Sequence, residues 1–306
     1  MRPRLSTLLS ALLLAAALPA VAAELPTLPP LPTTPPPGEL GRMVRLGREL
    51  IMHTDTAPLT RGLVGNKLTC ASCHIDGGTT NTPGTFVGTA TAFPAWSKRE
   101  RTVQTLQDRI DNCFMRSMNG KRPIVDSEAS IAMAAYVTWL SEGQPMRMNP
   151  VKPVTPLFSS RWPDAQYAPM FRHATHADYL HGAQVYATRC AACHGADGTG
   201  VGSTPAVWGK DSYNAGAGMS KPVKMASWVE HNMPLGNANL TPREVADVVL
   251  YVDAQPRPAF DLRQHLLPAA QMGVYNSKVL DEKSTVRSNL LAVGVDLDAL
   301  RGDAAH

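Results

Sequence analysis

The chain has 306 residues, of which 44% are apolar and only 6% are aromatic, enough to fill two modest cores. Its 29 basic and 25 acidic residues nearly cancel, and leaving out Arg2 and Arg4 at the N-terminus lowers the basic count to 27. This composition excludes a strongly basic, nucleic-acid-binding protein.

The N-terminus is typical of an exported protein. Arg2 and Arg4 precede an apolar run of 11 residues that ends at Leu18, and small residues at 20–23 offer a cleavage site. The apolar run is well short of the roughly 20 residues needed to cross a bilayer. We therefore expect residues 1–23 to be a cleaved signal peptide, and the mature chain to be periplasmic, with no membrane span.

Two domains are expected after a proline-rich tether at 24–38, where repeated prolines favour an extended chain over a packed element. The first domain is predicted at 39–150 and the second at 173–258. A proline-containing linker is predicted at 151–172, laid over the surface. The sequence assigns no role to the C-terminal tail at 259–306.

In the first domain, apolar residues at helical spacing predict an amphipathic helix, with Gly47 on its apolar stripe. Glycine there would let another helix approach closely. The stripe consists of Leu40, Met43, Val44, Leu50 and Ile51. The run Cys70-Ala-Ser-Cys73-His74 follows. Two more helices are predicted, one over 99–118 and one over 127–140 with Asp126 as its N-cap.

The second domain repeats this order of elements. Tyr179 to Thr188 predict a leading helix, and Cys190-Ala-Ala-Cys193-His194 comes next, 120 residues after the first such run. Thr241-Pro242-Arg243-Glu244 is a capping box with proline at the first helical position, so it predicts the start of a closing helix.

Both runs have the form Cys-x-x-Cys-His, in which two thiols bond to the vinyl groups of a haem and the histidine reaches the iron. One copy alone could be a redox dithiol or half of a zinc site, but a zinc site would need more cysteines than this chain has. We therefore expect two covalently bound haem c groups and an all-α fold of two tandem class I cytochrome c-like domains joined by the linker. The attachment residues are Cys70, Cys73, His74, Cys190, Cys193 and His194.

The sixth iron ligand of the second haem is predicted to be Met233. It lies in a Met-Pro loop before the closing helix, 39 residues after His194. A proline there stiffens the loop against the haem edge. Met219 and Met225 are alternatives from the same segment, because methionine is often only core filler.

The fifth cysteine, Cys113, is predicted to be the sixth ligand of the first haem. It also lies 39 residues after its motif histidine, His74. An odd thiol in an oxidising compartment is a liability unless its sulfur is occupied. The alternatives are ligation by Met115 or Met118, with Cys113 as an inert buried thiol or a partner in an intermolecular disulfide.

Basic residues surround Cys113 in the sequence. A helix over 99–118 would place Arg109, Arg116 and Ser117 on the same stripe as Cys113. Guanidinium groups would stabilise a thiolate and offer forked donors to an anionic substrate. A merely solvated charged face is the alternative. Further positive charge comes from Lys98, Arg99, Arg101, Lys121 and Arg122.

The run from Arg109 to Gly120, Arg-Ile-Asp-Asn-Cys-Phe-Met-Arg-Ser-Met-Asn-Gly, resembles the dihaem thiosulfate dehydrogenase (tetrathionate synthase) family. The two Cys-x-x-Cys-His sites and Asn232-Met233-Pro234 extend the resemblance over roughly residues 40–258. It implies that Cys113 is the distal ligand of an active-site haem and that Met233 caps an electron-exit haem. It also implies that Arg99, Arg109 and Ser117 bind thiosulfate.

The expected activity is the oxidation of two thiosulfate ions to tetrathionate through a covalent adduct on Cys113, with the reverse reaction using the same groups. Electrons would pass to a periplasmic acceptor such as a small cytochrome c or a high-potential iron–sulfur protein. Some family members carry a lysine that can exchange as a haem ligand where this chain has Asn232. Two alternatives are a non-catalytic dihaem electron carrier and a Sox-type subunit whose substrate is held by a separate carrier protein.

Overall fold

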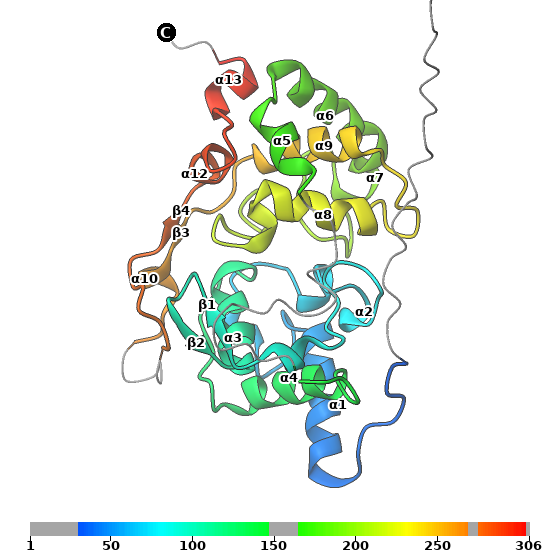
Figure 1. The fold of residues 1–306 in the computed structure, drawn as a ribbon, viewed down its shortest axis with the longest axis vertical. Helices are drawn as coiled ribbons and strands as arrows, with labels where there is room; N and C mark the ends of the chain where they lie inside the picture. Colours follow the sequence, from blue (N-terminus) through cyan, green and yellow to red (C-terminus); the bar gives the residue numbers. More distant parts are fainter. Residues whose placement is uncertain (1–29, 147–164, 269–274, 304–306) are drawn as a thin grey trace, which may run out of the picture.

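The computed structural model describes residues 30–146, 165–268 and 275–303. The predicted signal peptide, residues 24–29 of the predicted tether and residues 151–164 of the predicted linker lie outside these ranges. The described chain is mostly helical, with two short two-stranded sheets, and none of its helices is both long enough and apolar enough to cross a membrane. Figure 1 shows the first domain, in blue to green, below the second, with an orange-to-red segment along one side of both.

The first domain is built around the pair α1 and α4. Its elements in chain order are α1 (Gly38–Met52), η1 (Arg61–Leu63), η2 (Cys70–Ser72), α2 (Ile75–Gly78), η3 (Thr89–Ala92), β1 (Ala95–Ser97), β2 (Thr102–Gln104), α3 (Leu106–Arg116) and α4 (Glu128–Trp139). Strands β1 and β2 form an antiparallel hairpin in which Trp96 lies opposite Val103.

The second domain is built around the pair α6 and α9. Its elements are α5 (Tyr167–Arg172), α6 (His176–Arg189), α7 (Ala191–His194), η4 (Gly218–Ser220), α8 (Pro222–Asn232) and α9 (Pro242–Asp253). The predicted capping box is confirmed, because Thr241 caps α9 together with Glu244, and Pro242 stands in the first turn. The predicted leading helix is also present as α6, although it begins earlier, after Thr175.

A glycine lies at the crossing of each helix pair. A β-carbon on Gly47 of α1 would lie 2.0 Å from the carbonyl oxygen of Ala132 in α4, so the expected close approach is confirmed. Gly182 of α6 stands in the same relation to Asp247 of α9, again at 2.0 Å. A close helix approach at Gly182 was not predicted from the sequence. Both pairs need a residue without a side chain where the helix backbones meet.

The helix predicted over 99–118 is wrong in its first third. Residues 95–104 form the hairpin, and α3 begins only at Leu106 because Thr105 and Asp108 form a capping box. Arg101 takes a left-handed backbone conformation with φ 50°, which a helix cannot contain. The N-cap of α4 was also misassigned, because the Ser127 hydroxyl, rather than Asp126, accepts the amide hydrogen of Ser130.

The predicted linker is wrong at its C-terminal end. Tyr167 and Phe171 are completely buried and pack in the core of the second domain. They therefore belong to that domain through α5, and are not part of a surface connection. Residues 151–164 lie outside the described ranges.

The tail, whose role was not predicted, connects the two domains. It contains β3 (Phe260–Asp261), α10 (Leu262–His265), β4 (Lys283–Ser284), α12 (Val286–Leu291) and α13 (Leu297–Arg301). Phe260, Leu262 and Tyr275 form a small core with Met115 of the first domain. Further along, side chains of α12 and α13, with Leu290 fully buried, join the core of the second domain.

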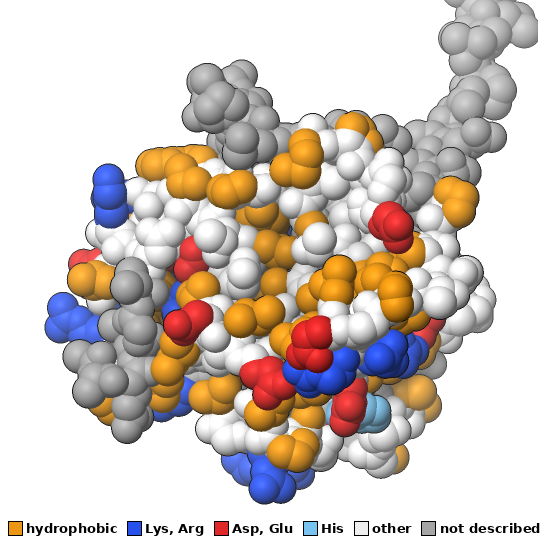
Figure 2. All heavy atoms as spheres, turned by 90° about the horizontal axis from the view of Figure 1, so that it is seen from below, with side chains coloured by type: hydrophobic (Ala, Val, Ile, Leu, Met, Phe, Trp, Pro, Cys, Tyr) orange, Lys and Arg blue, Asp and Glu red, His pale blue; other side chains and the backbone are white. Residues whose placement is uncertain are grey.

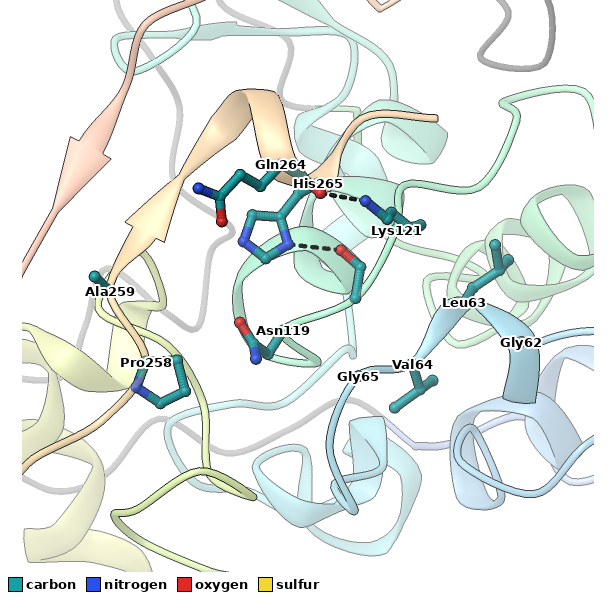
Figure 3. A pocket seen from close by; sticks show the side chains of 11 residues that line it. Gly62, Leu63, Val64, Gly65, Asn119, Lys121, Pro258, Ala259, Gln264 and His265 are labelled. Carbon is teal, nitrogen blue, oxygen red and sulfur yellow. Dashed lines mark hydrogen bonds between the residues drawn. The ribbon is translucent and has the colours of Figure 1, made fainter. Parts of the chain in front are cut away.

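A pocket of about 420 Å³ lies where the tail meets the loops of the first domain (Figure 3). Beside it, His265 Nδ1 lies 2.7 Å from the carbonyl oxygen of Gly120, and Lys121 donates to the carbonyl of Gln264. None of the predicted haem or substrate residues lines this pocket. Its contacts therefore anchor the tail to the first domain.

Direct hydrogen bonds also join the domains. The Trp228 indole N–H of α8 donates to the carbonyl of Cys73 at 2.9 Å, and the Asn214 amide donates to the carbonyl of Met115 at 2.9 Å. On the face shown in Figure 2, acidic and basic side chains lie side by side rather than in a patch of one sign. Among the exposed ion pairs, Arg42 of α1 pairs with both Glu39 and Glu128.

We predict that Gly47→Ala and Gly182→Ala each destabilise the protein by about 1–3 kcal/mol, because the new methyl group must push two helices apart. Thermal unfolding of the holoprotein measures this change. Gly62→Ala is the control, because an added β-carbon there meets nothing within 4 Å. Equal midpoints for Gly47→Ala, Gly182→Ala and the control would show that the crossings are not tightly packed.

Candidate active site and haem-attachment sites

Both motif histidines are oriented in the same way. His74 Nδ1 lies 2.6 Å from the carbonyl oxygen of Gly84, and His194 Nδ1 lies 2.9 Å from that of Pro205. Such a contact fixes the proton on Nδ1 and leaves Nε2 as the lone-pair nitrogen. Burial lowers the pKa of His74 to about 4, with the charge of Arg109 contributing, so its imidazole is neutral at pH 7.

The cysteines fit covalent haem attachment. All five are free thiols, so none is used in a disulfide. The thiols of Cys70 and Cys73 are followed by a histidine with a free Nε2, which is the donor set that haem c requires. The same set recurs at Cys190, Cys193 and His194, beside the core of the second domain. These six residues therefore fit two haem c groups.

Cys113 lies close to the first attachment site. Burial raises the pKa of Cys70 to about 12, and the charge of Cys113 adds to the rise. Burial, followed by the charge of Cys113, also raises the pKa of Cys73. The fold therefore brings the fifth cysteine, from α3, within electrostatic range of the two attachment cysteines.

Arg109 is in direct contact with the Cys113 sulfur. It stands one turn before Cys113 on α3, and its Nη1 donates to Cys113 Sγ at 2.9 Å. Both side chains are at least partly accessible. A guanidinium at this distance stabilises the anionic form of a thiol and leaves further N–H donors for an anion. Ser117, half buried, follows the last residue of the same helix.

Arg116 does not lie with Arg109 and Cys113. The prediction that it shares their stripe on the helix is therefore wrong. The guanidinium of Arg116 is buried and pairs with Glu100 at 3.2 Å and with Glu282 of the tail at 2.5 Å. It also lies over the ring of Phe260 at 4.9 Å. Two carboxylates and an aromatic face hold Arg116 on the core side of α3.

The other nearby basic residues divide between the core and the surface. Arg122 is buried and pairs with Asp108 at 2.9 Å, so it is structural. Arg99 keeps 37% of its side chain exposed, and its Nε lies 3.8 Å from Glu282. Partial burial, followed by the charge of Arg116, lowers the pKa of Arg99. The sequence analysis missed Glu100 and Glu282 because no local motif marks a carboxylate that pairs across the fold.

The alternative methionine ligands pack in the hydrophobic cores. Met115 is fully buried against Phe260 of the tail, and Met118 is buried in the core of the first domain. In the second domain, Met225 is core and its sulfur accepts the Tyr213 hydroxyl at 3.8 Å. Met219 packs against the cores of both domains.

Met233 ends α8 and packs, partly buried, against the same core as Cys190. The preceding Asn232 is buried, and its amide donates to the carbonyl oxygens of Pro83 at 3.2 Å and Trp228 at 2.9 Å. Asn232 thus makes an interdomain contact.

Known proteins match both halves of this arrangement. The family model described as SoxA/TsdA, cytochrome c domain, matches residues 64–146, and the model described as Cytochrome c matches residues 179–255. A thiosulfate dehydrogenase of Allochromatium vinosum is 37% identical over 270 residues, which cover 83% of this chain and 94% of the relative. The chain belongs to the thiosulfate dehydrogenase family.

Two further members of the thiosulfate dehydrogenase family support this assignment. The enzyme of Thiomonas intermedia is 33% identical over 269 residues, covering 86% of this chain and 81% of the relative. The solved structure of thiosulfate dehydrogenase TsdBA from Marichromatium purpuratum matches with a TM-score of 0.63 at 35% identity, over 76% of this chain. The match covers 50% of the TsdBA chain, so this chain spans about half of that length. The expected fold of two cytochrome c domains is confirmed.

The two α3 arginines should differ in their effect on stability. Arg116→Ala leaves Glu100 and Glu282 without their buried partner, and should destabilise the holoprotein by about 3–5 kcal/mol. Arg109→Ala removes an exposed side chain and should change stability by no more than about 0.5 kcal/mol. Urea unfolding of both variants measures the difference. Equal losses would mean that Arg109 is also a structural arginine.

Proposed function

We propose that this member of the thiosulfate dehydrogenase family oxidises two thiosulfate ions to one tetrathionate in the periplasm. The proposal assigns one haem c to each Cys-x-x-Cys-His site. Cys113 is the reactive residue, and Arg99, Arg109 and Ser117 bind the substrate. Membership of the family supports the substrate, and the exported-type N-terminus supports the compartment.

The observation that carries this proposal is the position of the Cys113 sulfur. It lies 2.9 Å from the Arg109 guanidinium and within electrostatic range of the first attachment cysteines. A thiol that served only as core filler would not need a cation in direct contact. A nucleophilic thiolate and an anionic substrate both benefit from one.

The reaction balances with Cys113 as the covalent carrier. In the first half-reaction, the Cys113 sulfur forms a bond to the sulfane sulfur of one thiosulfate ion, and these two sulfur atoms release two electrons. In the second half, the sulfane sulfur of a second thiosulfate attacks the same atom, so the sulfur–sulfur bond of tetrathionate forms and Cys113 departs as a thiolate. Haem c groups held at the two Cys-x-x-Cys-His sites would supply one-electron acceptors for these two electrons. Read backwards, the same steps reduce tetrathionate.

Basic residues of this chain assist both half-reactions. Arg109 attracts the dianion and, by its contact with the sulfur, stabilises Cys113 as the leaving thiolate. Arg99, partly exposed near Arg109, adds a second guanidinium for the sulfonate oxygens.

The second domain provides the electron exit in this proposal. The hydrogen bond from Trp228 to the Cys73 carbonyl links α8 of the second domain directly to the first attachment run. Met233, which shares a core with Cys190, is the proposed sixth ligand there. The proposed acceptor is a small periplasmic cytochrome c or a high-potential iron–sulfur protein.

Replacement of Cys113 tests the proposed chemistry. Cys113→Ser and Cys113→Met should both retain the haems but lose nearly all tetrathionate formation, because neither side chain can form the sulfur adduct and release it. A thioether can still bind iron, so Cys113→Met should keep a six-coordinate first haem with a raised reduction potential. Turnover of free thiosulfate with ferricyanide as acceptor, together with the optical spectrum, measures these effects.

The Cys113→Met variant separates an enzyme from an electron carrier. If it still makes tetrathionate at close to the wild-type rate, the covalent route through Cys113 is refuted. If the wild-type chain itself fails to oxidise free thiosulfate, the proposed function is wrong and a Sox-type role with a separate carrier protein takes its place.

A further inference from the structure

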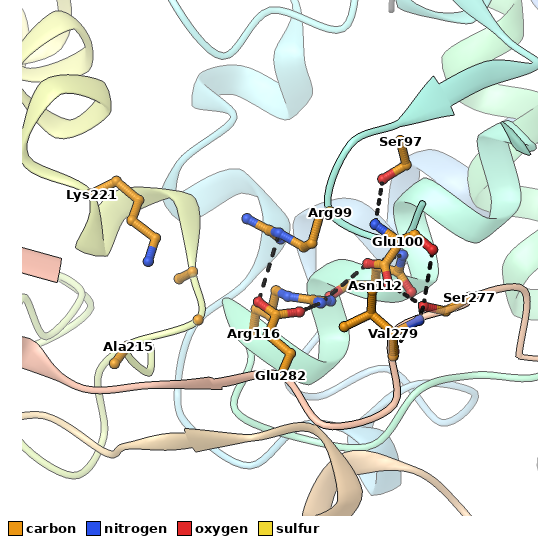
Figure 4. A network of polar contacts seen from close by, with 12 residues as sticks. Ser97, Arg99, Glu100, Asn112, Arg116, Ala215, Lys221, Ser277, Val279 and Glu282 are labelled. Atoms are coloured by element: carbon orange, nitrogen blue, oxygen red, sulfur yellow. Dashed lines mark hydrogen bonds and ion pairs between the residues drawn. The ribbon is translucent and has the colours of Figure 1, made fainter. Parts of the chain in front are cut away.

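Two cations from different domains face each other beside the proposed site. Figure 4 shows Lys221, which precedes α8 of the second domain, pointing toward Arg99, which follows the first strand of the hairpin in the first domain. Partial burial and then the charge of Arg99 lower the pKa of Lys221. Arg99 in turn lies within electrostatic range of Arg109. The positive charges therefore run from Cys113 across to the second domain.

This group has more positive than negative charge. Arg99 and Arg116 share the carboxylates of Glu100 and Glu282, so these four charges cancel. The nearby Asp253 is buried with Arg257 at 3.3 Å, so that pair also cancels. Within the described ranges, Arg109 and Lys221 form no ion pair with a carboxylate. The charge of Arg109 acts on the Cys113 sulfur, and the charge of Lys221 remains to attract a sulfur-oxyanion.

The C-terminal tail holds both facing cations. Glu282, just before β4, contacts Arg99 through its Oε1 and Arg116 through its Oε2. Asn289 of α12 accepts a hydrogen bond from Lys221 Nζ and donates to the carbonyl of Ala215 at 2.8 Å and to the Ser220 hydroxyl at 3.1 Å. An amide oxygen orients an ammonium group without neutralising it, so Lys221 remains available to an anion.

We propose that Lys221 is a substrate-binding residue, which with Arg99 holds a sulfonate group of thiosulfate or tetrathionate across the domain interface. Asn289 is the positioning residue that directs Lys221 to this place. The inference rests on the proposed function and extends it, because the substrate site then needs both domains and the tail. The first domain alone would lack part of the charge that binds the dianion.

Steady-state kinetics of the holoenzyme with thiosulfate test the role of Lys221. Lys221→Ala should raise KM about tenfold, the usual loss for one hydrogen bond to a charged group, while kcat stays within about twofold. Lys221→Arg should restore most of the affinity because it keeps the charge. Lys210→Ala is the matched control, since that lysine is in the same domain with 88% of its side chain exposed, and its KM should equal the wild-type value.

Asn289→Ala tests the positioning role. It should raise KM about threefold in the wild-type background and have no further effect in the Lys221→Ala background, because two residues that act through one contact are coupled. An equal rise in both backgrounds would overturn the positioning role of Asn289. The unfolding midpoint of each variant separates a loss of affinity from a loss of folded protein.

Two results would overturn the assignment of Lys221. One is a KM in Lys221→Ala that is unchanged from the wild type while tetrathionate is still formed. The other is an unchanged KM with a shifted haem midpoint potential, which would assign Lys221 to a haem propionate instead. Both differ from failure of the proposed function itself, which would appear as absence of tetrathionate from the wild-type enzyme.

Discussion

The buried ion pairs behind α3 are the constraint on which the proposed site depends. Arg116 with Glu100 and Glu282, and Arg122 with Asp108, hold the inner face of that helix with almost no exposure to solvent. Charges can be buried only when every partner is in place, so such a network admits one position of the helix. Cys113 and Arg109 lie on the more accessible side of the same helix. Their distance from the first attachment cysteines is therefore set by interactions that take no part in the chemistry.

The tail connects this ion-pair network to the second domain. Glu282 reaches Arg116 across 166 residues of sequence, and the helices that follow it are anchored in the core of the second domain. The Trp228 and Asn232 hydrogen bonds join the domains at the first attachment site and its following loop. Two cytochrome c domains thus form one unit in which the proposed substrate site and the proposed electron exit have a fixed relation.

Sequence reasoning succeeded where the signal is local. The Cys-x-x-Cys-His runs, the Thr241 capping box and the glycine at the α1 crossing each follow from a few neighbouring residues. It failed where the outcome depends on distant partners. Helical spacing alone placed Arg116 beside Cys113, whereas two carboxylates from the hairpin and the tail turn it inward. The late start of α3 was readable from Thr105 and Asp108, a capping box that charge patterning obscured. The contributions of Glu282, Asn289 and Lys221 have no local sequence signal.

Covalent attachment of the sulfur substrate to Cys113 is tested by mass spectrometry of the oxidised holoenzyme, which has no electrons to reduce the adduct, after addition of tetrathionate. The thiolate should displace one thiosulfate and retain the other, because this exchange needs no oxidant. We expect a mass increase of one thiosulfate unit on the peptide that contains Cys113. Further thiosulfate should remove this increase, and Cys113→Ser should lack it. An unmodified Cys113 peptide, in an enzyme that does turn over tetrathionate, would contradict covalent attachment.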